Sequence, residues 1–340
     1  MRSGEKHGKA KTACSSMEKT EILSEHPMPG PKVIKKHKKR GGRKMRSIFQ
    51  KIFVLGAGAI GSALGAFLSQ KKDVTLIGNK AHVDAINTHG LIIRGEINRR
   101  FSTKAETSIK EVPPSSLIIL TTKAQDSAEA ITGIKPLLKR GTVILVLQNG
   151  FGIKEIIEGI VGDEIEVVRG LVLMAAEFFE PGKITFWDGE IIIEATETGE
   201  RIATLLRESG LRTRISEDIK KDEWGKLVVN CVINPLTAIL RVRNYEIGVD
   251  ILKGIRHRIV QECIEVGKAE GMNFEPDLER DIDSKILSYK NYSSMSQDII
   301  NGKKTEIDFL NGKIFELGKK HGIPTPVNET LVGLIKFLEA

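Results

Sequence analysis

Short runs of apolar residues recur from Lys51 to about Glu194, with longer stretches of mixed character between them. Runs of this length that are rich in Val, Ile and Leu are typical of strands buried on both faces of a parallel sheet. We predict strands at residues 51–55, 74–77, 117–120, 143–147, 165–173, 183–186 and 190–194. Because helical stretches separate most of them, the pattern predicts one open sheet of the α/β class.

The pattern changes from strands to long helical segments at about Asp222. We therefore place a domain boundary at residues 215–221 and expect a sheet domain over residues 47–218 and an all-helical domain over residues 219–340. Two long apolar helical segments near the C-terminus, residues 307–317 and 331–338, make a homodimer an expectation.

The first predicted strand runs directly into a glycine-rich turn, Gly56-Ala57-Gly58-Ala59-Ile60-Gly61, and a helix of small and apolar residues follows. Gly56 permits the tight turn, Gly58 lets the backbone approach a pyrophosphate, and Gly61 lets the helix pack closely on the strand. Amide groups at the start of the helix then face the phosphate charge. Because the motif joins a strand to a helix, it indicates a dinucleotide site rather than a plain tight turn.

The second predicted strand is followed by Gly78-Asn79-Lys80, where the adenosine ribose of a dinucleotide would lie. An NAD site usually has Asp or Glu at this point to bind the ribose 2′-hydroxyl. This chain has no acid there, and Lys80 is suited to the 2′-phosphate of NADP. The pattern favours NADP(H), although a solvated surface lysine explains Lys80 nearly as well.

Polar side chains follow two further strands, in Thr121-Thr122-Lys123 and in Gln148-Asn149-Gly150. The carboxyl ends of parallel strands form the edge where open α/β sheets bind ligands. Each segment alone is compatible with ordinary loop chemistry, but their shared location favours Lys123 and Asn149 as site residues.

Three polar residues recur every four positions in the helical segment Trp224 to Pro235, which is otherwise almost wholly apolar. Lys226, Asn230 and Asn234 therefore lie on one helix face. A helix that is apolar nearly all round is buried, so this polar stripe is expected to face an enclosed cleft. The alternative makes Lys226 a surface lysine at a helix end and the asparagines internal hydrogen bonders.

A third polar cluster covers residues 291–298 and 305–312. Ser294, with Gln297 three residues later, reads as a capping box, which does not exclude contact with a ligand. Glu306 opens a predicted helix, and on local grounds it is expected to be a solvated acid of the first turn.

The net charge of +8 is concentrated at the start of the chain. Residues 1–46 hold 14 Lys and Arg against 4 Asp and Glu, whereas the remainder holds 38 against 40. We expect a disordered basic leader, or a reading frame opened too early with Met45 as the true start. Binding of nucleic acid or an anionic surface is the alternative, but no aromatic residue is interleaved with these basic residues.

No apolar run approaches the roughly 20 residues that span a bilayer. The three cysteines are far apart and odd in number, which predicts no disulfide framework and suits a reducing cytoplasm. No cluster of His, Cys, Asp or Glu at ligand spacing suggests a metal.

Several motifs together resemble the ketopantoate reductase family, in order and spacing, from about residue 51 to 328. They are the glycine turn, the Gln148-Asn149-Gly150-Phe151-Gly152 loop, Lys226 to Ala238 with its asparagines, Ser293-Ser294-Met295-Ser296-Gln297-Asp298, Thr305-Glu306-Ile307-Asp308 and His321 to Pro326. The helix with regularly spaced asparagines is far more discriminating than the glycine turn, which unrelated folds share.

The resemblance implies a Rossmann-type N-terminal domain, an all-α C-terminal domain like that of 6-phosphogluconate dehydrogenase, and a substrate cleft between them. It implies reduction of 2-dehydropantoate to (R)-pantoate with NADPH, a step toward pantothenate and coenzyme A. It makes Lys226 the general acid and places substrate at Asn230, Asn234, Asn244 and Ser294. It places the cofactor at Gly56 to Gly61, Lys123, Asn149, Ala176 and Glu306, although the residues around Asn244 and Ala176 depart from the family pattern.

Hydride addition to a ketone leaves negative charge on oxygen, which a cleft lysine can neutralise by donating a proton. Two other functions stay open: reduction of another branched 2-oxo acid, and non-catalytic sensing of NADP. A sensor would need the glycine turn but not Lys226 and its asparagine register.

Overall fold

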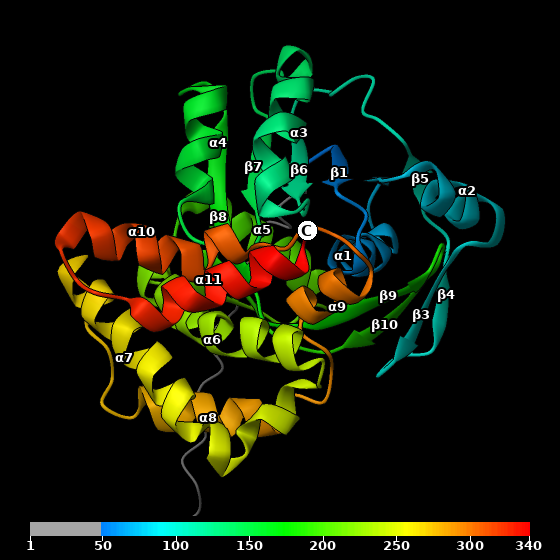
Figure 1. Ribbon diagram of the computed structural model, residues 1–340. Coiled ribbons are helices and arrows are strands. Elements are labelled where there is room, and N and C mark those ends of the chain that lie inside the picture. The colour runs from blue at the N-terminus through cyan, green and yellow to red at the C-terminus, as the bar shows by residue number, and fades with distance from the viewer. Residues whose placement is uncertain (1–48) are drawn as a thin grey trace, which may run out of the picture. The chain divides into compact units, whose positions relative to one another are not determined.

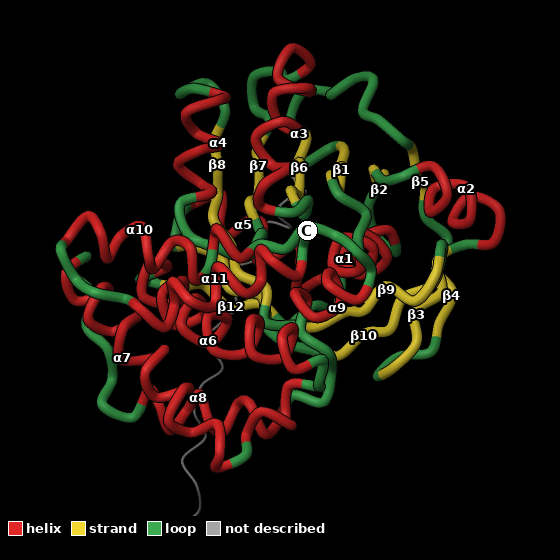
Figure 2. The backbone as a smooth tube through the Cα atoms, in the orientation of Figure 1, coloured by secondary structure: helices red, strands yellow, loops and turns green. Residues whose placement is uncertain are grey.

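The computed structural model describes residues 49–340. The predicted basic leader, residues 1–46, and the candidate start at Met45 therefore lie outside the described residues. Within residues 49–340, every strand lies before residue 217, where strands alternate with helices, and residues 219–340 hold only helices and loops (Figure 2). Among these residues, none of the helices combines the length and the hydropathy that a membrane span needs.

An eight-stranded sheet forms the centre of the first half, in the order β12-β11-β8-β7-β6-β1-β2-β5. All neighbours are parallel except β8 and β11, which are antiparallel. Its strands are β1 (Lys51–Leu55), β2 (Val74–Ile77), β5 (Lys104–Glu106), β6 (Ser116–Leu120), β7 (Val143–Val146), β8 (Glu166–Val172), β11 (Ile191–Glu194) and β12 (Thr213–Ser216). This mostly parallel, Rossmann-like sheet confirms the predicted α/β class.

Helices cover both faces of the sheet, which explains the continuous apolar runs. Ile52 and Val54 of β1 pack in one core with α1 (Ala59–Ser69) and α5 (Glu197–Glu208). Phe53 and Leu55 point to a second core with α3 (Ser127–Ile134) and α4 (Ile153–Val161), which lie side by side in Figure 1. Successive side chains of a strand alternate between the faces, so both must be apolar when both are covered.

A second sheet of four strands, in the order β4-β3-β10-β9, was not predicted. It contains β3 (Leu91–Gly95), β4 (Arg99–Phe101), β9 (Ala175–Glu180) and β10 (Lys183–Trp187), and α2 (Lys80–His89) precedes it. The prediction that residues 183–186 complete the main sheet is therefore wrong. The reason is visible in β10, where Ile184 and Phe186 are buried and the intervening residues are not, as expected for a strand covered on one face.

The second half of the chain is helical and is built around α6 (Ile219–Leu240). The surrounding helices are α7 (Lys253–Ala269), α8 (Leu278–Ser288), α9 (Ser294–Ile300), α10 (Asn311–His321) and α11 (Pro326–Leu338). In Figure 1, α6 lies among α7, α9 and α11, and these helices pack against it. The start of α6 at Ile219 agrees with the predicted change of pattern, while the division into domains at 218/219 stays a prediction.

Pro235 lies inside α6 and does not end it. Proline has no backbone N–H, so the carbonyl of Cys231, four residues earlier, loses its helical partner. The side-chain amide of Asn311 in α10 donates to this carbonyl at 3.0 Å. The same amide donates to Asn328 of α11 at 2.9 Å. Asn311 therefore satisfies the carbonyl that Pro235 leaves without a partner and connects α6, α10 and α11.

Candidate active site

The glycine turn lies at the carboxyl end of β1, against the residues that follow β6. Gly56 has a φ of +109°, and a Cβ atom there would lie 2.4 Å from the Thr122 nitrogen. A Cβ atom on Gly61 would lie 2.3 Å from the Gly56 carbonyl oxygen. Both positions therefore require glycine, for the tight turn and for close packing of the helix start.

Gly58 is different, because a Cβ atom there would meet no protein atom within 4 Å. Gly58 is the N-cap of α1, and no side chain caps this end of the helix. The first-turn amides, which belong to Ala59, Ile60 and Gly61, therefore have no side-chain acceptor. Open space in front of such a helix end suits a phosphate group, so the turn fits a dinucleotide.

Lys80 lies at the first position of α2, directly after β2. Asn79 caps this helix by accepting from the His82 N–H at 3.0 Å. The Lys80 amine pairs with Asp84 at 2.8 Å, and its side chain is 82% exposed. The residue therefore lies at the predicted strand end, on the surface and with an acidic partner.

Lys123, Asn149 and Glu306 come together, although Glu306 is distant from the others in sequence. One oxygen of Glu306 accepts from the Ala124 N–H at 3.1 Å, and the other from the Asn149 amide at 3.2 Å. The side chain is buried, so the expectation of a solvated acid is wrong. Protein N–H groups replace water around this carboxylate, which makes its burial tolerable.

Lys123 is held by Asp298 of α9, with 2.5 Å between amine and carboxylate. Burial alone would lower the pKa of Lys123, but the negative charges of Glu306 and Asp298 outweigh it and raise the pKa. Burial raises the pKa of Asp298 to about 6, against the opposing effect of Lys123. This ion pair joins the carboxyl end of β6 to the helical half of the chain.

The Lys226 amine is inaccessible to solvent and has no hydrogen-bond partner. It lies at a narrow cavity that is also lined by Asn149, Gly150, Arg169, Leu171, Glu223, Leu227 and Asn230. The side-chain nitrogen of Asn230, one turn further along α6, is likewise buried without a partner. Two donors at one cavity therefore lack an acceptor that the protein itself supplies.

The environment of Lys226 favours the neutral amine. Burial is the main cause and the nearby Arg169 cation the second, and together they lower the pKa of Lys226 to about 7. The carboxylates of Glu306 and Glu223 oppose this shift. An amine with a pKa near neutrality can donate and recover a proton at ordinary pH.

The remaining predicted site residues do not line this cavity. Asn234 is buried in the next turn of α6, and Asn244 is buried at the start of η3 (Asn244–Gly248), its side-chain oxygen without a partner. Ala176 lies in β9, a strand that packs against α1. Ser294 begins α9, but the cap is Ser293, which accepts from the Ser296 N–H at 3.0 Å. The predicted capping box of Ser294 and Gln297 is therefore wrong, because the N-cap is Ser293.

Sequence reasoning missed Arg169 and Glu223, which both line the cavity. A signal for Arg169 is present, because this cation stands alone in the apolar run Val167-Val168-Arg169-Gly170-Leu171-Val172. A charged side chain in a doubly covered strand needs buried partners. Glu223 has no comparable signal, since an acid near the start of a helix is ordinary.

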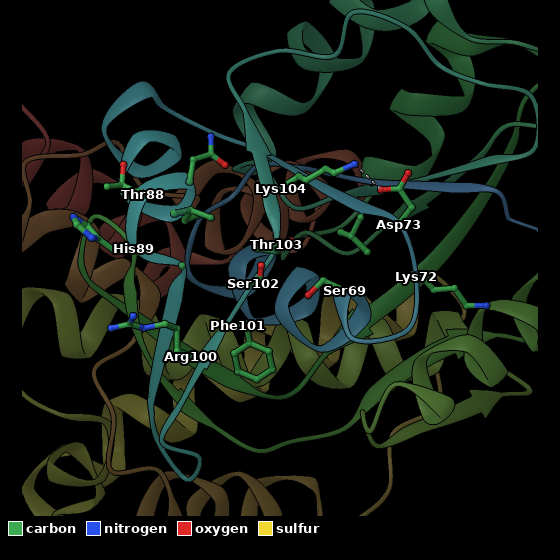
Figure 3. Close-up of a pocket in the computed structure, with 14 residues that line it drawn as sticks. Ser69, Lys72, Asp73, Thr88, His89, Arg100, Phe101, Ser102, Thr103 and Lys104 are labelled. Atoms are coloured by element: carbon green, nitrogen blue, oxygen red, sulfur yellow. Dashed lines mark ion pairs between the residues drawn. The ribbon is translucent and has the colours of Figure 1, made fainter.

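A larger hollow lies elsewhere, between the C-terminal ends of α1 and α2 and the segment that joins β4 to β5 (Figure 3). Its lining includes Lys72, His89, Arg100 and Lys104, and Figure 3 shows Lys104 paired with Asp73. None of the predicted site residues is among those that line it. Cavity size alone would therefore have pointed away from Lys226.

Both halves of the chain match one family. Residues 52–197 match the family described as ketopantoate reductase PanE/ApbA, and residues 218–339 match its C-terminal part. The 2-dehydropantoate 2-reductase of Pyrococcus horikoshii is 39% identical over 300 residues, which are 85% of this chain and 98% of that protein. The protein of the same name from Lactococcus lactis is 33% identical, with the same shares covered.

Solved structures agree with the fold. A PanE/ApbA family ketopantoate reductase from Ralstonia eutropha superposes with a TM-score of 0.78 at 29% identity, over 85% of this chain and 98% of that one. A ternary structure of D-mandelate dehydrogenase with NADH and anilino(oxo)acetate gives 0.76 at 30% identity, over the same shares.

Proposed function

Because this chain belongs to the ketopantoate reductase family of oxidoreductases, we propose that it reduces 2-dehydropantoate to (R)-pantoate with NADPH, a step toward pantothenate and coenzyme A. The observation that carries the proposal is the buried Lys226 amine, unpartnered at a cavity that Asn149 also lines. A protein that only sensed the nucleotide would have no need of this amine.

The glycine turn would hold the pyrophosphate, with open space at Gly58 and uncapped amides at the start of α1. A reduced nicotinamide cofactor, when bound, supplies the hydride. Asn149, held by Glu306, lies at the predicted cofactor edge and also lines the Lys226 cavity. It would therefore orient the reacting ends of cofactor and substrate.

Lys226 would bind the ketone oxygen and give it a proton as negative charge develops there. With a pKa of about 7, a large fraction of the amine is protonated at neutral pH. The neutral amine left behind is tolerated in this site, because burial disfavours the charged form. Asn230 would donate to the same substrate, and Asn234, Asn244 and Ser294 stay candidates for its remaining groups.

The test is oxidation of NADPH by the purified protein in the presence of 2-dehydropantoate. We expect 2-dehydropantoate to have a higher kcat/KM than any other 2-oxo acid in a panel of branched and aromatic compounds. Cofactor binding without turnover of any 2-oxo acid would reject an enzymatic function and favour a sensor.

A second candidate is reduction of a 2-oxo acid with a different side chain. The similarity to a D-mandelate dehydrogenase favours it, because mandelate is an aromatic 2-hydroxy acid. The same chemistry at Lys226 would serve both substrates, since they share the 2-oxo carboxylate. Phenylglyoxylate reduced with a higher kcat/KM than 2-dehydropantoate would select this candidate.

A further inference from the structure

Arg169 is a buried cation in the middle of β8, and each of its three side-chain nitrogens donates to a protein acceptor. One terminal nitrogen donates to the Val146 carbonyl at 3.1 Å and to the Gly170 carbonyl at 2.8 Å. The other donates to the carbonyls of Gln148 and Gly150 at 3.1 and 3.2 Å. The remaining nitrogen, Nε, donates to Glu223 of α6 at 2.7 Å.

These bonds connect the two parts of the proposed site. The carbonyls of Gln148 and Gly150 flank Asn149, so the guanidinium fixes the backbone on both sides of that side chain. Glu223 precedes Lys226 by three positions on α6, which places both on one helix face. A single planar group thus ties the Asn149 loop to the helix that carries the amine.

We propose that Arg169, anchored by Glu223, is a positioning residue that sets the Lys226 amine and the Asn149 amide relative to each other. The inference rests on the proposed function, because it names what those two groups act on. The guanidinium group is suited to this task, because its N–H donors lie in one plane and bind several acceptors at fixed positions. Lysine, with a single flexible ammonium group, cannot hold the same set.

Arg169 also contributes to the electrostatics at the amine. The charged groups that act on Lys226 are Arg169 of β8, Glu223 of α6 and Glu306 before η5 (Ile307–Phe309). Arg169 lowers the pKa of Lys226, whereas both carboxylates raise it. Removing the cation therefore raises the pKa of Lys226, and removing the Glu223 charge lowers it.

The experiment compares the pH dependence of kcat/KM for 2-oxo acid reduction in Arg169→Met, Arg169→Lys and Glu223→Gln. Only the protonated amine donates, so reduction falls as pH rises through the pKa of Lys226. We expect this fall to move to higher pH in Arg169→Met and to lower pH in Glu223→Gln. In Arg169→Lys the fall in kcat/KM stays near its original pH. The kcat drops at least tenfold, because the backbone around Asn149 is no longer held.

Arg214→Met is the matched control. Arg214 of β12 also pairs with a carboxylate in the first turn of α6, Asp222, at 2.6 Å, but neither residue lines the Lys226 cavity. Its pH profile should match that of the unaltered protein. Thermal unfolding of every variant shows whether a loss of activity comes from loss of the fold or from displacement of the Lys226 and Asn149 side chains. If Arg169→Met does not fold, Glu223→Gln still tests the inference, because glutamine keeps a hydrogen-bonding group at that position.

Equal pH profiles for Arg169→Met, Glu223→Gln and Arg214→Met would overturn the inference, even with the enzyme active on 2-dehydropantoate. A protein that reduces no 2-oxo acid would instead overturn the proposed function. In that case ¹⁵N NMR still tests the two opposite shifts in the pKa of Lys226. The Nζ signal is identified by its absence from Lys226→Met and is then titrated in each variant. Identical titrations in Arg169→Met and Glu223→Gln would reject the role of Arg169.

Discussion

The Lys226 amine makes the stability of the folded protein depend on pH. Its pKa is about 7 in the folded state and 10.5 in an ordinary environment. Between these values the unfolded chain binds a proton that the folded chain does not, so unfolding becomes less favourable as pH rises. The contribution of this group to the free energy of unfolding should therefore increase from pH 7 to 10.5, by up to about 1.4 kcal/mol per pH unit.

Comparison with Lys226→Met isolates this contribution, because every other titrating group is shared. Chemical denaturation of both proteins across that pH range should give a difference in stability that favours Lys226→Met most strongly at pH 7. The difference should shrink as pH rises toward 10.5. A difference independent of pH would mean that the amine titrates normally in the folded protein.

The proposed preference for NADPH over NADH depends on Lys80. Lys80→Ala should raise the KM for NADPH about tenfold, or roughly 1.4 kcal/mol, and leave the KM for NADH unchanged. The reason is that the 2′-phosphate, which only NADPH carries, loses its cation. Lys139→Ala is a control, since Lys139 is an exposed lysine paired with Glu111. Equal effects on both cofactors would leave Lys80 an ordinary surface lysine paired with Asp84.

At the scale of elements, substitutions in the turn between β1 and α1 distinguish effects on folding from effects on nucleotide binding. Gly58→Ala introduces a methyl group into space that no protein atom occupies, at a φ of −74° that alanine adopts freely. We expect unchanged thermal stability and at least a tenfold loss of NADPH affinity, measured by calorimetric titration. Gly61→Ala should lose both, because its Cβ atom would lie 2.3 Å from the Gly56 carbonyl.

Gly159→Ala in α4 serves as the control for both variants, since its Cβ atom also meets no neighbour. It should bind NADPH with unchanged affinity. Normal NADPH binding by Gly58→Ala would show that the open space at the helix start does not receive the pyrophosphate.

The proline defect in α6 predicts a stability effect far from the cavity. Asn311→Ala leaves the Cys231 carbonyl and the Asn328 side chain without their buried donor. An unsatisfied buried polar group costs about 1–3 kcal/mol, so the denaturation midpoint should fall accordingly. Asn301→Ala, which removes an exposed side-chain bond to the Gln297 carbonyl, should change stability by less than about 0.5 kcal/mol. Equal losses in the two variants would contradict this account of Pro235.

At the scale of the whole molecule, the parallel sheet and the long central helix could be predicted because burial dictates their composition. The strand predicted at residues 74–77 is β2 without change, and two of the three stripe residues of α6, Lys226 and Asn230, line a cavity. The second sheet escaped prediction because β4 has only three residues, no residue of β9 is fully buried, and the pairing of β3 with β10 that joins the two hairpins is long-range. Glu306 was misjudged for a similar reason, since its partners Ala124 and Asn149 lie far away in the sequence.

The site as a whole is assembled from segments that the sequence keeps apart. Lys123 and Asn149 come from strand ends, Glu306 and Asp298 from the helical half, and Arg169 from a strand interior. Local patterns identify residues at strand ends and on helix faces, because those positions follow from periodicity. They mark Arg169 only as a lone cation in an apolar run, because its partners depend on what the fold brings against it.

The central claim is that the Lys226 amine donates the proton, and single-turnover oxidation of NADPH by Lys226→Ala tests it most directly. With 2-dehydropantoate present, we expect the rate to fall about 10²–10⁴-fold, while NADPH affinity stays within a factor of a few. Lys221→Ala is the control, because this lysine of α6 pairs with exposed Glu275 at 2.8 Å. A Lys226→Ala rate close to that of Lys221→Ala would contradict the account.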